Sequence, residues 1–236
     1  MTSSGYETTV AHLTDSRIRF GTVIRELARG KSVLRATFNS RIDRLPVTGN
    51  VLDLGARNRS SSYYRFLDSH DARVTYCDYL PQDPGMMCVD LEDPLPFGDR
   101  SFDVVLLLFV LNHIWNIGGL MRDIRRVCRS HAIIATSFVH QHTPEPHDYS
   151  RLTEEGLSRL FAESGFPEFQ IFPVGHGPCT LALSALQQTA HFAPGATAFY
   201  HLVWAADGLL IRAAPCRTRL RSVMTHISVL RAGHQT

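Results

Sequence analysis

The feature that most constrains the fold is an almost uninterrupted apolar run at 101–109, in which every residue from Val104 to Phe109 is hydrophobic. Runs of this kind are typical of parallel strands that helices cover on both faces, since neither face then meets water. Parallel strands also need a long crossover connection, which is usually a helix. The run therefore predicts a layered α/β domain.

The rest of the chain alternates in the same sense. Amphipathic helices are expected at 119–129 and 153–164, the second capped by Thr153 and ended by Gly165. One or two lead-in helices are expected within 6–46. Further strands are expected at 50–54, 73–77, 86–89, 132–138 and 169–174, and a helix at 63–68. We predict an open, mostly parallel, Rossmann-like sheet with helices on both faces, which binds ligands at the carboxyl ends of its strands.

The C-terminal part has a different composition, because residues 169–206 contain no Asp, Glu, Lys or Arg. The stretch is long enough to cross a bilayer, but several polar residues interrupt it. Two apolar helices, at about 179–191 and 197–211, fit it better. They would cover the sheet, form a lid over a substrate or lie on a membrane surface, and the Arg-rich end would be solvated or face a membrane. Three regions are expected: a helical lead-in at 1–48, a core at 49–175, and a C-terminal region at 176–236.

The charge distribution bears on the partners. The net charge of the 236 residues is +2, yet residues 1–48 hold 8 basic and 4 acidic groups, and residues 208–236 hold 5 Arg and no acid. The body between them is therefore acidic, which argues against a nucleic-acid partner. The basic ends can still contact an anionic membrane. Only Lys31 among the 24 basic residues is a lysine, a bias that GC-rich coding produces, so we expect a bacterial source.

Cysteine usage and the N-terminus bear on the compartment. The five cysteines are odd in number and form no CxxC motif, which disfavours a disulfide framework or a cysteine zinc site. The first ten residues lack the charged and apolar segments of a signal peptide. We expect a cytoplasmic protein, with peripheral contact at the inner face of the membrane as the alternative. The oligomeric state is left open.

Carboxylates follow three of the expected strands. Asp53 lies at the end of the first strand with Gly55, which permits a tight turn and a close approach of backbone to a ligand. Asp78 ends the second strand, where an acid in a dinucleotide-type fold binds ribose hydroxyls. Asp90 and Leu91 follow the third and are placed to meet an adenine edge. Taken alone, Asp53 is more typical of a turn former, and Asp78 and Asp90 are compatible with ordinary strand-end carboxylates.

Together these segments resemble the class I S-adenosylmethionine-dependent methyltransferases of the type 11 group, most closely the branch often encoded with bacterial polysaccharide genes. The resemblance covers about residues 49–174. The segments that carry it are Leu52–Gly55, Cys77–Asp78, Asp90 with Leu95–Phe97, Ser101–Val105, Val110–Ile114, His147–Leu157 and Glu163–Phe166.

The resemblance implies S-adenosylmethionine above the strand ends. Asp53, Gly55 and Ala56 would face its methionine part, with Arg57 near the carboxylate or in solvent. Asp78 would hold the ribose hydroxyls with Tyr79 beside it. The remaining cofactor contacts implied are Asp90, Leu91, Phe109 and Asn112.

The sequence departs from the family pattern in the glycine loop, which keeps Gly55 alone, and at Asn112, where a Glu is usual. The turn before the fifth strand, at 129–131, also lacks its usual glycines. A catalytically degenerate protein that serves as a binding partner or scaffold is therefore the competing hypothesis.

A hydroxyl acceptor would need a general base, and histidine is suited to the role by its pKa. The candidates are His113, His140, His142, and His147 with Asp148, although Asp148 could instead pair with Arg151. The same cluster at 140–148 contains ligand types for a metal ion, but two prolines restrict the loop, and no metal is expected. We expect methyl transfer to an oxygen, in preference to nitrogen or carbon, of a sugar, glycan or secondary metabolite.

Overall fold

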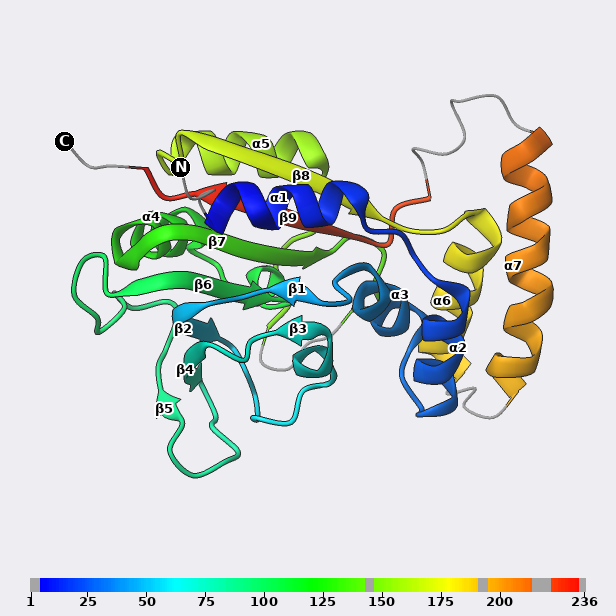
Figure 1. Cartoon of the computed structure of the whole chain (residues 1–236), viewed down its shortest axis with the longest axis horizontal. Helices are drawn as coiled ribbons and strands as arrows, with labels where there is room; N and C mark the ends of the chain where they lie inside the picture. The colour runs from blue at the N-terminus through cyan, green and yellow to red at the C-terminus, as the bar shows by residue number, and fades with distance from the viewer. Residues whose placement is uncertain (1–4, 143–146, 191–194, 214–221, 234–236) are drawn as a thin grey trace.

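The computed structural model describes residues 5–142, 147–190, 195–213 and 222–233. Within these residues a seven-stranded sheet has the order β5-β4-β2-β6-β7-β9-β8 (Figure 1). The strands from β5 to β7 are parallel, as is β8, and β9 is antiparallel to both of its neighbours. The bounds are β2 Gly49–Leu54, β4 Ala72–Asp78, β5 Met87–Cys88, β6 Phe102–Leu108, β7 Cys128–Ser137, β8 Glu168–Val174 and β9 Thr225–Arg231. The predicted mostly parallel α/β sheet is confirmed.

The C-terminal segment corrects the sequence analysis, which expected a solvated or membrane-facing end. Strand β9 lies inside the sheet, where Ile227 pairs with Ala135 of β7 and with Phe172 of β8. All of its residues except Arg231 are buried. The prediction was wrong here because the strand is only seven residues long and no more than two apolar residues follow one another in it, so its sequence carries little strand periodicity. Their burial comes from pairing on both sides.

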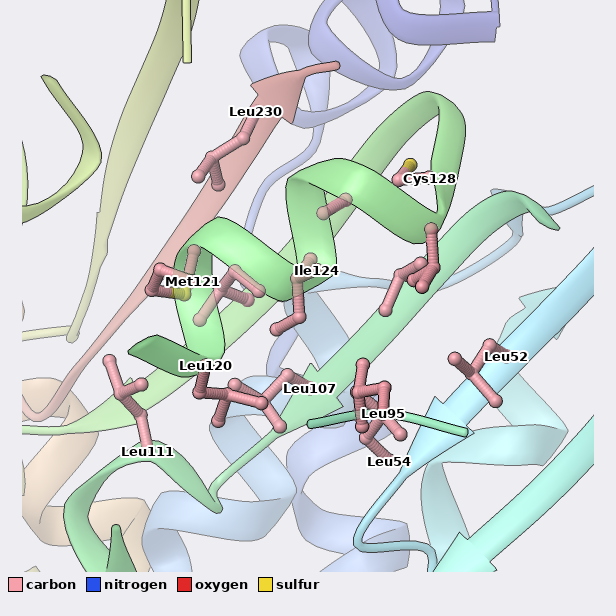
Figure 2. Packing of buried hydrophobic residues seen from close by; sticks show 14 of the residues in the cluster. Leu52, Leu54, Leu95, Leu107, Leu111, Leu120, Met121, Ile124, Cys128 and Leu230 are labelled. Carbon is pink, nitrogen blue, oxygen red and sulfur yellow. The ribbon is translucent and has the colours of Figure 1, made fainter. Parts of the chain in front are cut away.

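Helices cover both faces of the sheet. Helix α4 (Ile117–Val127) and helix α5 (Glu154–Glu163) pack on one face, where Met121 and Ile124 meet Leu107 of β6 (Figure 2). On the other face, α1 (Gly5–Asp15) buries Tyr6 and Leu13 against the sheet. These layers explain why the apolar run of β6 is continuous, since its side chains point alternately into two separate cores.

Four helices form a third layer beyond the carboxyl ends of β6 and β7 (Figure 1). Buried side chains from each of them pack together with Met224, which precedes β9. We call these four helices the cap. Its members are α2 (Phe20–Ala28), α3 (Val33–Arg41), α6 (Pro178–Ala190) and α7 (Gly195–Ala213). The cap covers the sheet edge at which ligands of such sheets bind.

Two local predictions differ from the structure. The helix expected at 63–68 is a 3-10 turn, η1 (Ser62–Phe66), followed by the short strand β3 (Leu67–Asp68), which pairs in parallel with β1 (Leu45–Pro46). The lead-in comprises three helices within the described residues instead of one or two. No helix in the described ranges has both the length and the apolar character that a membrane crossing requires.

Candidate functional site

The turn that leaves β2 is held against the end of β4. The backbone amides of Gly55 and Ala56 both donate to the carbonyl of Cys77, at 2.9 and 3.0 Å. Gly55 has φ +77°, and a Cβ there would lie 2.3 Å from Cγ2 of Val110. Only glycine suits this conformation and this contact. The backbone turn predicted from Gly55 is therefore present at the carboxyl end of β2.

Asp53 lies buried directly beneath this turn. Its Oδ2 accepts a 2.9 Å hydrogen bond from the hydroxyl of Tyr63 and another from Tyr64, while its Oδ1 is buried and has no partner within the described residues. Burial raises the pKa of Asp53 to about 6, the two tyrosine hydroxyls oppose this rise, and the nearby Asp78 adds to it. The site thus holds an acceptor oxygen that awaits a donor.

Asp78 is bound by the loop that follows the turn. The amide of Arg57 donates to its Oδ2 at 2.7 Å, and the amide of Leu80 donates to its Oδ1 at 2.9 Å. Each carboxylate oxygen has a second lone pair, so two acceptor positions remain. Tyr79 beside it is exposed. Arg57, also exposed, has φ +54°, a left-handed conformation that glycine adopts more readily than arginine.

Asp90 and Leu91, which were predicted to meet the adenine, differ in their exposure. Asp90 is exposed, and its Oδ1 accepts from the amide of Glu92 at 2.9 Å. Leu91 is buried in the core with Leu54 and Leu95. Its side chain therefore anchors the segment, while Asp90 remains open to a ligand.

Phe109 follows β6 with φ +65°, outside the usual range for a bulky residue. Its ring packs on Phe38 of α3, with ring centroids 4.7 Å apart. The guanidinium carbon of Arg35, also in α3, lies 4.5 Å from the centroid of the Phe109 ring. The strand end is therefore joined to the cap.

Asn112 holds the later loop against the turn after β6, η2 (Leu111–His113). Its side-chain amide donates to Oδ1 of Asp148 at 3.1 Å, and its main-chain carbonyl accepts from the backbone amide of Tyr149 at 2.8 Å. The guanidinium of Arg151 donates hydrogen bonds to both carboxylate oxygens of Asp148, whose side chain is only 3% exposed. The pairing of Asp148 with Arg151 leaves this carboxylate a positioning group.

The two histidines near this turn have different surroundings. Nδ1 of His113 bonds to the carbonyl of His147, which can only accept, so Nε2 of His113 is left to accept from Asn112 at 3.2 Å. His147 is exposed and stacks on Tyr149, with ring centroids 5.3 Å apart. Its ring nitrogens have no hydrogen-bond partner in the described ranges. Of His113 and His147, only His147 therefore has ring nitrogens that are available for proton transfer.

A small pocket opens beside this turn, between the ends of β6 and β7 and the loop before α5. Among its lining groups, Oγ1 of Thr136 is buried and has no partner among the described residues. The lining residues are Leu111, Asn112, Thr136, Ser137, Ser150 and Leu152. The pocket can accept or donate hydrogen bonds at several hydroxyls and one amide.

The remaining candidates lie apart from this pocket. His140 and His142 are exposed, and part of the predicted metal cluster, 143–146, lies outside the described residues. No group of three His, Cys, Asp or Glu side chains in the described ranges is arranged to hold a metal ion.

Sequence reasoning missed Arg35, Tyr63 and Tyr64 as site residues. The tyrosines lie ten and eleven positions after Asp53, in a segment expected to be a helix, and Arg35 precedes the core altogether. No spacing rule connects these three residues to the strand ends, because Arg35 reaches the site from the cap and the two tyrosines reach it from the η1 turn.

Comparisons with known proteins agree with this architecture. Residues 47–136 match the family model described as "Methyltransferase domain". A Haloferax volcanii structure, a complex between the Trm112 methyltransferase activator and a putative methyltransferase, matches with 18% identity, TM-score 0.55, 93% of this chain and 99% of that chain. The [4+2]-cyclase SpnF matches with 15% identity, TM-score 0.51, 84% of this chain and 80% of that chain. No curated protein sequence matches the chain.

Proposed function

We propose that this chain, whose residues 47–136 match the family model described as "Methyltransferase domain", is an S-adenosylmethionine-dependent enzyme that methylates an oxygen, in preference to nitrogen or carbon, of a sugar, glycan or secondary metabolite. The observation that carries the cofactor part of the proposal is the set of unpaired acceptor positions on Asp53 and Asp78, at the ends of β2 and β4. The fold by itself does not fix the chemistry, since one similar structure is a cyclase.

The residues at the strand ends fit the cofactor. The unpartnered Oδ1 of Asp53 suits an ammonium group, and the free lone pairs of Asp78 suit ribose hydroxyls. The other residues proposed to contact the cofactor are Gly55, Ala56, Arg57, Tyr79, Asp90, Leu91, Phe109 and Asn112. When bound, the cofactor supplies a methyl group that its sulfonium sulfur already makes electrophilic.

The chain's own contribution is to bind, to orient and to exclude water. The cap of α2, α3, α6 and α7 lies beyond the carboxyl ends of β6 and β7, and the pocket beside Asn112 has room for little more than one water molecule. We assign proton removal from the acceptor to His147. Asp148 and His113 position the loop that carries it.

Calorimetric titration with S-adenosylmethionine and S-adenosylhomocysteine tests the proposal. The wild type should bind with micromolar affinity, and Asp78→Ala should abolish binding because the ribose hydroxyls lose their acceptor. Asp68→Ala, which removes an exposed carboxylate at the end of β3, is the matched control and should bind like the wild type. Sugars should then be screened as acceptors. A folded wild type that binds neither compound would instead support the degenerate scaffold.

The outer face of α7 favours a second property, contact with an anionic membrane surface on the cytoplasmic side. Phe199, Leu202, Leu209 and Leu210 are exposed on this helix, with Leu202 and Leu209 each 67% exposed. Its one acid, Asp207, is buried and accepts hydrogen bonds from the first turn of α6. Arg212 lies in the last turn of the helix, and the sequence that follows adds three arginines before residue 222 and no acid. An apolar stripe next to basic residues suits anionic lipid.

Flotation with phosphatidylglycerol-containing vesicles tests this contact in the full chain. Leu202→Ser with Leu209→Ser should reduce flotation, whereas Leu80→Ser, at a leucine that is 70% exposed elsewhere, should not. Truncation before α6 is unsuitable, since it also removes β9 from the sheet. Equal flotation of all three proteins, or of none, would contradict the membrane contact.

A further inference from the structure

Three aromatic rings meet at the surface between two loops. Trp115 comes from the segment between η2 and α4, and His147 and Tyr149 come from the loop before α5. The ring centroids of Trp115 and Tyr149 lie 5.4 Å apart at an interplanar angle of 67°, and Tyr149 stacks on His147. Trp115 is 74% exposed and Tyr149 is 44% exposed. We call these three residues the aromatic platform.

The packing of helix α4 does not account for Trp115. This residue immediately precedes Asn116, the N-cap of the helix. An apolar side chain at such a position commonly packs on the fourth helical residue, which here is Leu120. Leu120 is only 4% exposed and belongs to the core, whereas the indole of Trp115 remains in water. The indole therefore contributes little to the fold.

The backbone that carries the rings is nevertheless held in place. The carboxylate of Glu92 accepts hydrogen bonds from the amide of Trp115 at 2.6 Å and from that of Asn116 at 3.1 Å. On the other loop, the amide of Tyr149 donates to the main-chain carbonyl of Asn112 at 2.8 Å. A fixed backbone that presents exposed rings reduces the entropy that a ligand loses on binding, which is the arrangement of a binding surface.

The chemistry of the platform indicates a neutral ligand. The nearby carboxylates are already engaged, since Glu92 binds two backbone amides and Asp148 pairs with Arg151. The indole N–H of Trp115 and the hydroxyl of Tyr149 form no hydrogen bond within the described ranges. A ligand that fits has a flat apolar face and hydrogen-bonding groups around its rim. A pyranose ring has this form, because its C–H bonds make the faces and its hydroxyls surround them.

We propose that the aromatic platform binds a pyranose ring of the acceptor, which stacks on the indole of Trp115 with one of its hydroxyls facing His147. This inference rests on the proposed function and narrows the acceptor class to sugars. The pocket beside Asn112 has room for little more than one water molecule, so an acceptor needs a surface outside it. The platform supplies this surface next to the one histidine of the two loops that we assign to proton removal.

Single-tryptophan variants test the stacking directly. The chain has two tryptophans, and the second, Trp204 of α7, stacks on His176 in the cap with ring centroids 3.4 Å apart. In Trp204→Phe, a panel of methyl pyranosides should shift the fluorescence emission of Trp115 to shorter wavelength, because a stacked sugar removes the indole from water. In Trp115→Phe, the matched control, the emission of Trp204 should not change.

Affinities measured by ligand-observed NMR test the contribution of the ring. Trp115→Ala should bind the pyranosides about tenfold more weakly than the wild type, because it loses the aromatic face. Trp115→Phe keeps a smaller ring and should lose about threefold. Since the indole is exposed, both variants should keep the melting temperature of the wild type, so that a loss of binding is not a loss of fold.

Three results would overturn the platform. The first is that no pyranoside shifts the emission of Trp115, and the second is that the sugars shift the emission of Trp204 instead. The third is a shift with choline and not with sugars, which would assign the indole to a methylated ammonium ligand.

The cofactor titration separates this failure from that of the proposed function. A wild type that binds S-adenosylhomocysteine but no pyranoside keeps the proposed enzyme class and loses the platform. A wild type that binds a pyranoside at Trp115 but neither S-adenosylmethionine nor S-adenosylhomocysteine keeps the platform as a sugar site and loses the methyl transfer.

Discussion

The hydroxyl of Tyr63 donates a hydrogen bond of 2.9 Å to Oδ2 of Asp53, a carboxylate that the fold removes from water. Burial raises its pKa from 3.8 to about 6 in spite of this bond. An acid whose pKa is higher in the folded state stabilises the protein when protonated. This contribution is therefore complete below pH 3.8 and is lost as the pH rises through about 6.

The first prediction concerns this loss. Between pH 4.5 and 7.5, the free energy of unfolding of the wild type should fall by about 2 kcal/mol more than that of Asp53→Asn, whose amide does not titrate. Urea unfolding of both proteins at the two pH values measures the difference. Identical pH dependences would mean that Asp53 is not desolvated in the folded protein.

The second prediction concerns the contact between Gly55 and Val110. Gly55→Ala should lower the free energy of unfolding by about 2 to 4 kcal/mol, because the new methyl group overlaps the Val110 side chain and the backbone is left-handed. Combining it with Val110→Ala should cost less than the sum of the two single changes, since the overlap disappears. Denaturant unfolding of the four proteins gives this coupling, and strict additivity would contradict the close approach.

The third prediction uses the left-handed conformation of Arg57. Arg57→Gly should raise the free energy of unfolding by about 1 kcal/mol, because glycine adopts φ +54° without strain. Arg59→Gly, in the same loop without a positive φ, should leave stability unchanged or lower it. The melting temperatures of both variants measure this difference, and equal shifts in the two would contradict backbone strain at Arg57.

The fourth prediction follows from the place of β9. A chain that ends at residue 221 leaves β7 and β8 without the strand between them, and it exposes the buried side chains that Ile227 and Val229 contact. It should lack a cooperative thermal transition. A chain that ends at residue 233 keeps the whole sheet and should melt like the full protein. Circular dichroism on heating distinguishes the two, and a cooperative transition in the shorter chain would contradict an integral role for β9.

Much of the fold was predictable because its signals are local. The continuous apolar run of β6, the amphipathic face of α4 and the Thr153 cap of α5 each lie within a dozen residues, and all were predicted close to their observed bounds. The position of β9 between β7 and β8 was not predictable, since its burial depends on two partner strands that lie about sixty and ninety residues earlier in the chain.

The sequence by itself determined which acids and which glycine follow the strands, because each lies next to its own apolar run. Only the tertiary structure decided what those groups meet. Tyr63 and Tyr64 both donate to one oxygen of Asp53 and leave the other, which is buried, without a partner, and α3 brings Arg35 over Phe109 from outside the sheet. Hydrogen bonds and ring contacts act over a few ångströms in space whatever the separation along the chain, so they become visible only once the cap and the sheet have packed together.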